Sequence, residues 1–342
     1  MIYLTLKLGL IVNSNIATQL KEYEKVFKNE IIKIATIFKN KKNVFPYRYA
    51  NISNEISWNS KCIVLSQAKK MYQYNSCGKY FSMSYSSIWT RQSYKIDINK
   101  ETVTLFLGKP QFCKELILPI YWSPYVRKRL CIGRCGELRL YNVGKKWFVY
   151  LDIAYKSTYN SLKKEMGVDI GVKVPAVTIT SDNKVRFFGN GREIRYIQRR
   201  FKKMYQELQA RKQHTKMRKL NHKLRKILIF YDHVISKNII KFAVSESIGV
   251  IKLEDLTGIR STFNIKYFSN IYLWSYRRLQ ECIEYKAKLE GIKVLYVNPY
   301  RTSKKCPKCN KVNFPRDRLY KCKCGFIGHR DIVGAFNILH AL

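Results

Sequence analysis

Four cysteines near the C-terminus have the spacing of a metal site. Cys306 and Cys309 form one pair, Cys322 and Cys324 form the other, and twelve residues lie between the pairs. Two short loops that each carry two thiolates can surround a Zn²⁺ ion tetrahedrally, as structural zinc sites do. We therefore predict that these cysteines bind a structural Zn²⁺ ion.

The residues around these cysteines agree with two tight loops. Pro307 favours a turn, and Asn310 and Gly325 are of the types that tolerate positive φ just after a ligand. Only Lys323 separates the second pair, which makes that loop tighter than the usual two-residue spacing. His329 follows closely and is the alternative fourth ligand in place of one thiol.

Three acidic residues are candidates for a second metal site. Asp169 lies early in the predicted strand of GVDIGVKVPAVTIT, Glu254 ends the predicted strand VIKLE, and Asp331 begins a predicted helix. Each alone could be a helix cap or the solvent boundary of a strand. Together, three carboxylates can hold two Mg²⁺ ions about 3.5–4 Å apart, an arrangement that polarises a phosphodiester and activates water.

The most basic segment spans residues 192–226, with 14 Lys+Arg and two Glu, a net charge of 14 − 2 = +12. Its apolar residues recur at helical spacing in two stretches, with a break near residues 212–215, which predicts two helices that each have one apolar seam. A solvated hairpin usually mixes charge signs, so we favour a phosphate backbone as the partner. The candidate nucleic-acid-binding residues are Arg192, Arg195, Arg199, Arg200, Lys202, Lys203, Arg211, Lys212, Arg218, Lys219, Lys223, Arg225 and Lys226.

The charge of the whole chain points the same way. The 342 residues carry 65 Lys+Arg against 23 Asp+Glu, a net charge of +42, which indicates a polyanionic partner. A generally lysine-rich proteome is the alternative, but it would not explain the local clustering. Hydrophobic residues make up 46% of the chain, which excludes a disordered basic tail protein.

The N-terminal half contains elements of two kinds. Residues 3–12 read as a strand, residues 16–38 as an amphipathic helix with Asn15 as its cap, and residues 57–72 as a second helix. Between residues 92 and 155, short alternating segments predict a small antiparallel barrel or sandwich. Cys131 and Cys135 lie in this region without a second pair nearby, and we expect them to be buried thiols.

The C-terminal half reads as strands followed by alternating helices and strands, which predicts an α/β layer with a mixed sheet. No apolar run reaches the roughly 18 residues of a membrane span, and the N-terminal apolar run lacks the features of a signal peptide. We therefore expect a soluble, cytoplasmic protein with no membrane partner. The ten cysteines are not expected to form a disulfide framework.

Several motifs, in order, resemble the TnpB proteins of insertion sequences, the OrfB-type proteins with a C-terminal zinc ribbon. The similarity covers roughly residues 160–342, and the related type V CRISPR effectors share the three acidic positions. The motifs are GVDIGV, VIKLEDL, a helix with Trp274 and Tyr285-Lys286-Ala287 before Gly291-Ile292, NPYRTSKKCPKCN, YKCKCGF and GHRDIVGAFNIL.

The resemblance implies a split RuvC-type nuclease domain with an RNase H-like fold over residues 160–342, including a basic helical hairpin at 190–230 and a zinc ribbon at 303–327. It implies Asp169, Glu254 and Asp331 as catalytic residues. Upstream, it implies a β-barrel wedge-like domain at residues 1–12 and 90–158, with a helical recognition-like insertion at 15–85. The implied partners are target DNA and a guide RNA from the transposon end; sequence would be read by base pairing.

Two departures from the family pattern stand out. The Cys322-Lys323-Cys324 loop is tighter than most, and Val333-Gly334 replaces the more frequent Asn-Ala after Asp331, which could alter how the last helix packs. Neither removes a catalytic carboxylate.

The sequence therefore favours an RNA-guided, Mg²⁺-dependent DNA endonuclease associated with transposition, as a monomer or dimer. In this hypothesis Asp169 and Asp331 hold one Mg²⁺ jointly and Glu254 holds the second. One alternative is a non-catalytic regulator of transposition or guide-directed repressor, and another is a plain zinc-ribbon DNA-binding protein.

Overall fold

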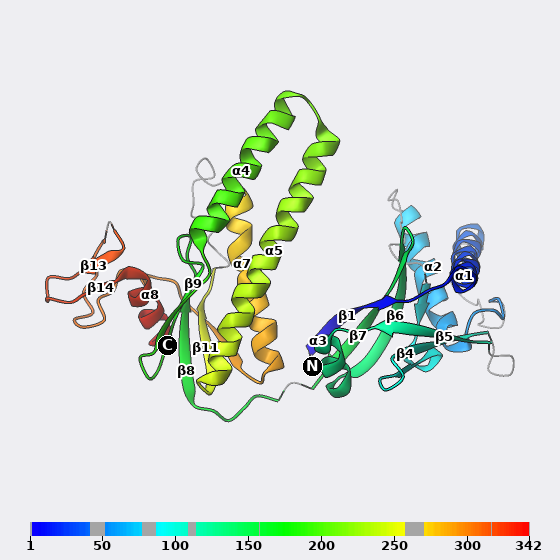
Figure 1. The fold of residues 1–342 in the computed structure, drawn as a ribbon, viewed down its shortest axis with the longest axis horizontal. Coiled ribbons are helices and arrows are strands. Elements are labelled where there is room, and N and C mark those ends of the chain that lie inside the picture. The colour runs from blue at the N-terminus through cyan, green and yellow to red at the C-terminus, as the bar shows by residue number, and fades with distance from the viewer. Residues whose placement is uncertain are drawn as a thin grey trace. The chain divides into compact units, whose positions relative to one another are not determined.

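A computed structural model describes residues 2–41, 52–76, 87–108, 114–156, 158–256, 270–315 and 317–341 of the chain. The chain divides into two compact units, Met1–Lys156 and Ser157–Leu342 (Figure 1). Within the described ranges, no helix is long and apolar enough to cross a membrane.

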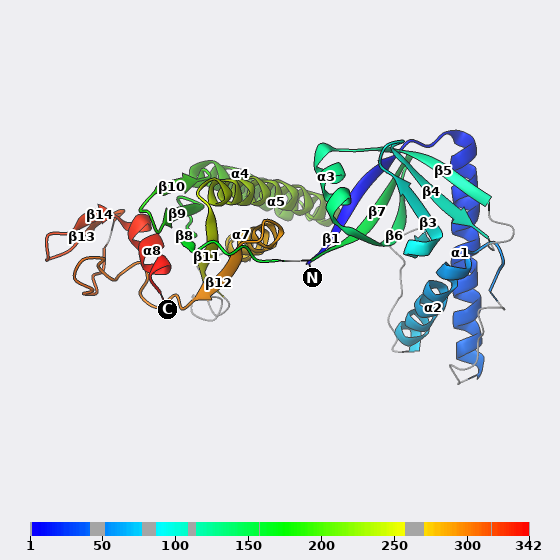
Figure 2. The same cartoon turned by 90° about the horizontal axis from the view of Figure 1, so that it is seen from below.

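The first unit is built on a curled, seven-stranded antiparallel sheet (Figure 2) with the strand order β2-β6-β7-β1-β5-β4-β3. Its side chains alternate between core and surface, so that β7 buries Trp147, Val149, Leu151 and Ile153 on one face. The strands are β1 (Ile2–Leu10), β2 (Ser87–Trp89), β3 (Tyr94–Asp97), β4 (Thr102–Leu107), β5 (Lys114–Tyr121), β6 (Arg134–Val143) and β7 (Lys146–Tyr155).

Two helices, α1 (Ser14–Lys41) and α2 (Lys61–Ser76), lie between β1 and β2 in chain order and pack on each other. The expected cap of α1 is wrong by two residues, because the side chain of Asn13 accepts the hydrogen bond from the Ile16 N–H at 2.8 Å. The first unit also contains the 3₁₀ turns η2 (Trp58–Ser60) and η3 (Arg91–Ser93) and the short helix α3 (Pro124–Ile132).

The expectation of buried thiols at Cys131 and Cys135 is also wrong. Cys131 is exposed at the end of α3, and Cys135 is half-buried in β6. The core side of α3 is formed instead by Val126 and Leu130, so the periodicity of the helix turns Cys131 outward.

The second unit contains a five-stranded mixed sheet with the order β10-β9-β8-β11-β12. The central strands β8 and β11 are parallel, whereas β9 and β10 return antiparallel as a meander. The strands are β8 (Lys164–Asp169), β9 (Ala176–Thr180), β10 (Val185–Phe188), β11 (Ile248–Glu254) and β12 (Lys293–Val297).

Helices cover both faces of this sheet (Figure 1). Met166 and Val168 of β8 face α5 (His214–Ser245) and α7 (Asn270–Leu289), and share one core with them. On the other face, Val177 and Ile179 pack against α8 (Arg330–Leu339). The helix α4 (Gly191–Ala210) packs along α5, and the break between these two helices falls where the sequence predicts it.

One expected strand is divided in two. The apolar segment 167–180 predicts one strand with Asp169 early in it, but β8 ends at Asp169 and β9 begins at Ala176 in the opposite direction. The turn between them contains Pro175, which cannot donate a ladder hydrogen bond. Asp169 therefore lies at the end of a central strand.

The short strands β13 (Leu319–Lys321) and β14 (Ile327–His329) form a separate antiparallel pair just before α8. The turn between the two strands carries Cys322 and Cys324, and the loop before β13 carries Cys306 and Cys309.

Candidate functional site

The three predicted carboxylates lie at the same edge of the sheet in the second unit. Asp169 is the last residue of β8, and Glu254 is the last residue of β11. The two strands are parallel neighbours, and Val168 is paired with Leu253. Since neighbouring strands lie about 4.8 Å apart, the carboxyl ends of β8 and β11 place Asp169 beside Glu254.

The helix α8 brings Asp331 to the same place. Asp331 lies in the first turn of α8 and is only 8% exposed. The helix approaches β8 closely at two glycines. A Cβ on Gly167 would lie 2.3 Å from the carbonyl oxygen of Ala335, and one on Gly334 would lie 2.7 Å from Oδ2 of Asp169. Glycine at 334 therefore leaves room for the Asp169 carboxyl beneath the helix.

The electrostatics of Asp169 show that the three carboxylates interact. Burial, followed by the negative charges of Glu254 and Asp331, raises the pKa of Asp169 to about 8, against the smaller opposing effects of Arg318 and Arg330. Burial also raises the pKa of Glu254, while a hydrogen bond from Thr302 lowers it. Buried groups that repel one another in this way need a cation to be ionised together.

Three further residues hold this site, and the sequence analysis missed them. The Thr302 hydroxyl donates a hydrogen bond to Oε1 of Glu254, and the Gln280 side-chain amide donates to the Glu254 backbone carbonyl at 2.7 Å. The Arg318 guanidinium pairs with Oδ2 of Asp331. Thr302 lies within the motif NPYRTS, but nothing in the spacing of the sequence singles out these side chains.

The carboxylates are near neighbours, but they are not drawn into one tight cluster. Among the described residues, the four cysteine thiols are the group of three or more potential ligands whose atoms all lie within 4.8 Å of one another. Asp331 is held by Arg318, and uncompensated carboxylates repel. The guanidinium here supplies the positive charge that a metal ion would otherwise bring to Asp331.

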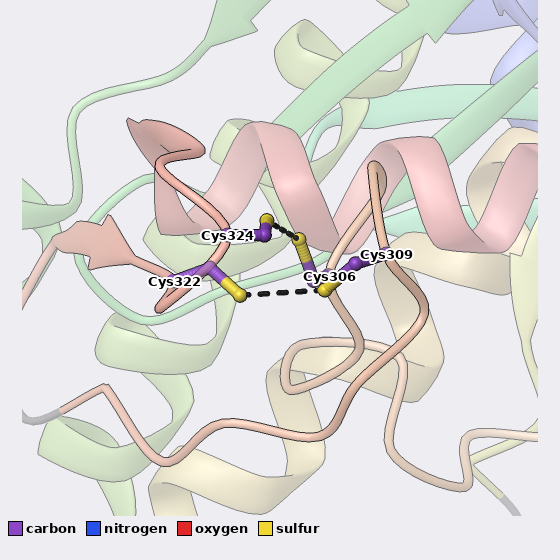
Figure 3. A group of neighbouring side chains, drawn as sticks. All are labelled: Cys306, Cys309, Cys322 and Cys324. Atoms are coloured by element: carbon purple, nitrogen blue, oxygen red, sulfur yellow. Dashed lines mark hydrogen bonds between the residues drawn. The ribbon is translucent and has the colours of Figure 1, made fainter.

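The four cysteines converge from two loops, as Figure 3 shows. The Sγ atoms of Cys306 and Cys324 lie 3.7 Å apart, and those of Cys309 and Cys322 lie 3.5 Å apart. A tetrahedral ion with Zn–S bonds of about 2.3 Å would separate its sulfurs by about 3.8 Å. The thiols therefore fit a zinc ion without a change of backbone.

The loops have the predicted backbone conformations. Asn310 and Gly325 have φ values of 58° and 85°, and their N–H groups donate to the carbonyls of Cys306 and Cys322. The N–H of Cys324 is the main cause of a Cys322 pKa lowered to about 6, which favours the thiolate that binds metal.

His329 does not take the place of a thiol. Its Nδ1 accepts a hydrogen bond from the Asp331 N–H at 3.3 Å and so caps α8. Its ring lies edge-on to Phe187 at 5.4 Å. The alternative zinc ligand set with His329 is therefore wrong for this structure.

The basic hairpin of residues 192–226 is formed by α4 and the first part of α5. Of the thirteen candidate nucleic-acid-binding residues, all but Arg195 are exposed, and Arg195 is half-buried. Met217, Leu220 and Leu224 of α5 are buried, so the apolar seam faces inward and the cations face solvent. Their role as phosphate ligands stays a prediction.

Comparisons with known proteins bear on the same regions. The family model described as "Cas12f1-like, TNB domain" matches residues 276–338, which include the cysteine cluster and Asp331. A TnpB-like protein of Methanocaldococcus jannaschii is 36% identical over 157 residues, which are 43% of this chain and 56% of that protein. A CRISPR-associated endodeoxyribonuclease Cas12f1 of Sulfoacidibacillus thermotolerans is 33% identical over 215 residues, which are 56% of this chain and 50% of that protein.

The chain thus spans about half the length of the curated relatives that it matches. A solved structure of a Cas12f1–sgRNA–target DNA complex has the same fold, with a TM-score of 0.65 at 16% identity, and covers 96% of this chain and 82% of that chain. The comparisons confirm the resemblance on which the sequence analysis relied: the chain is similar to TnpB-like proteins and to the Cas12f effectors.

Proposed function

We propose that this protein is an RNA-guided, Mg²⁺-dependent DNA endonuclease, with Asp169, Glu254 and Asp331 as the catalytic carboxylates of a RuvC-type, RNase H-like domain. The observation that carries the proposal is the convergence of these three carboxylates at one edge of the sheet, where burial and the charges of Glu254 and Asp331 raise the pKa of Asp169 to about 8. Two strand ends and one helix start bring these groups together. Mutual repulsion of this kind is typical of functional sites.

The three carboxylates suit divalent cations, because they are hard oxygen ligands whose negative charges a cation would compensate. Asp169 and Asp331 would hold one Mg²⁺ jointly, and Glu254 would hold the second. When bound, such ions polarise a phosphodiester and lower the pKa of water. Thr302 orients Glu254, and Arg318 supplies positive charge beside Asp331 where a substrate phosphate would add negative charge.

The fourfold thiol cluster suits a structural Zn²⁺ ion held by Cys306, Cys309, Cys322 and Cys324. Its place in the chain directly before α8 gives it a function in the nuclease site. The Arg330 N–H donates to the carbonyl of Arg318, and Arg318 pairs with Asp331. A zinc ion would therefore fix the loop that positions both Arg318 and the start of α8.

The cationic hairpin of α4 and α5 would bind the backbone of guide RNA or of the RNA–DNA heteroduplex. The relatives named above include a CRISPR-associated endodeoxyribonuclease, and the solved structure with the same fold holds an sgRNA and target DNA. With sequence read by base pairing, the protein needs only a positively charged channel. The net charge of +42 is of the kind such a channel requires.

The test is reconstitution with RNA transcribed from the flanking transposon end. Two guides with different target segments should direct cuts in the presence of Mg²⁺ to two different DNA sites beside the same short motif. The Asp169→Ala variant should bind the guided target and leave it uncut. Guided binding without cutting by the wild-type protein would favour the alternative of a guide-directed repressor, and binding that ignores the guide would favour a plain zinc-ribbon DNA-binding protein.

A further inference from the structure

A cationic cavity lies at the outer edge of the nuclease sheet, apart from the three carboxylates. It has a volume of about 460 Å³ and opens between the edge strand β10 and the C-terminal part of α5. Figure 2 shows β10 beside β9, at the outer edge of this sheet. The lining residues that matter here are Arg186, Phe188, Asn238, Lys241, Phe242 and Ser245.

One wall of the cavity carries a guanidinium that lies over two aromatic rings. The centre of the Arg186 guanidinium lies 5.3 Å from the ring centroid of Phe242 and 5.9 Å from that of Phe188, both of which are buried in the core. A guanidinium that lies over a ring still has its N–H groups available for a planar acceptor such as phosphate. Arg186 can therefore keep these ring contacts while it binds an anion.

The opposite wall comes from one face of α5. Asn238, Lys241 and Ser245 are exposed and follow one another at three- and four-residue spacing, so all three side chains point to the same side of the helix. In the described part of the chain, neither Arg186 nor Lys241 has a carboxylate within ion-pair distance. The neighbouring Glu246 is already paired with Lys184 at 2.5 Å.

The register of the strands relates this cavity to Asp169. Asp169 is paired with Val177, and Val177 is paired with Phe187 on its other side. The three residues form one row across the sheet, so Phe187 lies two strand spacings, about 10 Å, from Asp169. Arg186 directly precedes Phe187 in β10, so its side chain lies on the face of the sheet that α5 covers. The side chain of Asp169 lies on the opposite face, against α8.

We propose that this cavity binds a backbone phosphate of the DNA strand that is being cut, several nucleotides from the scissile phosphate. A strand that leaves the carboxylates across β9 and β10 and turns around this edge of the sheet would reach the cavity on the α5 face. Arg186 and Lys241 would neutralise the phosphate, and the Asn238 amide would bind a remaining oxygen or the sugar, whereas the Ser245 hydroxyl already donates to the Phe242 carbonyl at 2.9 Å. The inference rests on the proposed nuclease function only for the identity of the strand.

The first test measures phosphate contacts without any cutting. The affinity of the full-length protein for single-stranded DNA is measured against salt concentration for wild type and for Arg186→Gln/Lys241→Gln. Each lost phosphate contact lowers the salt slope by about 0.7 for a single strand, so we expect a fall of about 0.7 for the one phosphate that Arg186 and Lys241 bind together. The matched control is Lys163→Gln/Lys293→Gln, which removes the same charge from exposed lysines outside the cavity.

The second test locates the phosphate on the strand. Guided target DNA carries a single neutral methylphosphonate at successive positions on either side of the cut, and binding is measured with the Asp169→Ala protein. A methylphosphonate at one position, roughly two to six nucleotides from the cut, should weaken binding about tenfold when Arg186 and Lys241 are both present. The same replacement should have no further effect on binding by the protein that also carries Arg186→Gln and Lys241→Gln.

The outcomes are separable from those of the proposed function. A salt slope equal to that of the control variant, or a methylphosphonate effect that is the same with and without Arg186 and Lys241, would overturn the cavity assignment. A loss confined to guide RNA binding would overturn it too, because the phosphate would then belong to RNA. A clear slope change in a protein that never cuts DNA would support the phosphate site and refute the nuclease.

Discussion

Replacing Gly334 by alanine tests whether the carboxyl of Asp169 must lie where the structure has it. The new Cβ would lie 2.7 Å from Oδ2 and 3.0 Å from Cγ of Asp169. Ordinary contact begins near 3.4 Å, so the carboxyl would move by roughly 3.4 − 2.7 = 0.7 Å. The clash is with the end of a side chain, which can turn away without moving the helix.

The expected loss is much larger in activity than in stability. A displacement near 1 Å at a reacting group costs up to about 100-fold in rate, so we expect single-turnover cleavage to fall by about 10- to 100-fold. Overpacking lowers the free energy of unfolding by about 1–3 kcal/mol, whereas the higher helix propensity of alanine inside α8 raises it by about 1 kcal/mol. The free energy of unfolding should therefore fall by less than about 2 kcal/mol.

The assay compares cleavage rate and melting temperature for three glycine variants. Gly9→Ala is the neutral control, since its Cβ would meet only Cβ of Tyr121 at 3.7 Å. Gly167→Ala should lose stability as well as activity, because its Cβ would lie 2.3 Å from the carbonyl oxygen of Ala335, a backbone atom that cannot turn away. Wild-type cleavage by a stable Gly334→Ala protein would refute the assigned position of the Asp169 carboxyl.

Three further predictions concern the groups around the two metal sites. Thr302→Val should lower the cleavage rate about tenfold through loss of the hydrogen bond to Glu254, whereas Thr302→Ser should keep the rate; equal rates for both would contradict this role. In EDTA, Asp169 of the folded protein keeps a proton up to about pH 8, whereas Asp169 of the unfolded chain loses it above about pH 4. The melting temperature should therefore fall as the pH rises from about 5 to 8, and the fall should be smaller in Asp169→Asn. Cys309→Ser should lose bound zinc by metal analysis and lower the melting temperature, while Cys131→Ser, at an exposed thiol, should change neither.

The sequence predicts the framework of the site better than its contacts. The spacing of the cysteines anticipates two loops with positive φ at Asn310 and Gly325, because local turn chemistry determines both. The hairpin break near residue 212 is likewise a local feature. The apolar segment 167–180 is wrongly predicted as one strand, because β8 and β9 are both buried and only Pro175 marks the turn between them.

Contacts made by residues far apart in the chain could not be predicted. Thr302 reaches Glu254 across 48 residues, and Gly334 meets Asp169 only because α8 packs on β8. The replacement of Asn-Ala by Val-Gly after Asp331 looks in the sequence like a departure that could disturb packing. In this chain the Asp169 carboxyl lies where the Cβ of the more frequent alanine would be, so glycine at 334 leaves space for the position that the carboxyl takes here.

The central claim is that three carboxylates form one nuclease centre, and single-turnover cleavage by neutral, nearly isosteric variants tests it most directly. Asp169→Asn, Glu254→Gln and Asp331→Asn are compared with wild type on guide-matched DNA in Mg²⁺, with target affinity measured in parallel. The account predicts that each variant cuts at least about 1,000-fold more slowly while binding the target within a few-fold of wild type. Cleavage near the wild-type rate by any of the three would contradict it.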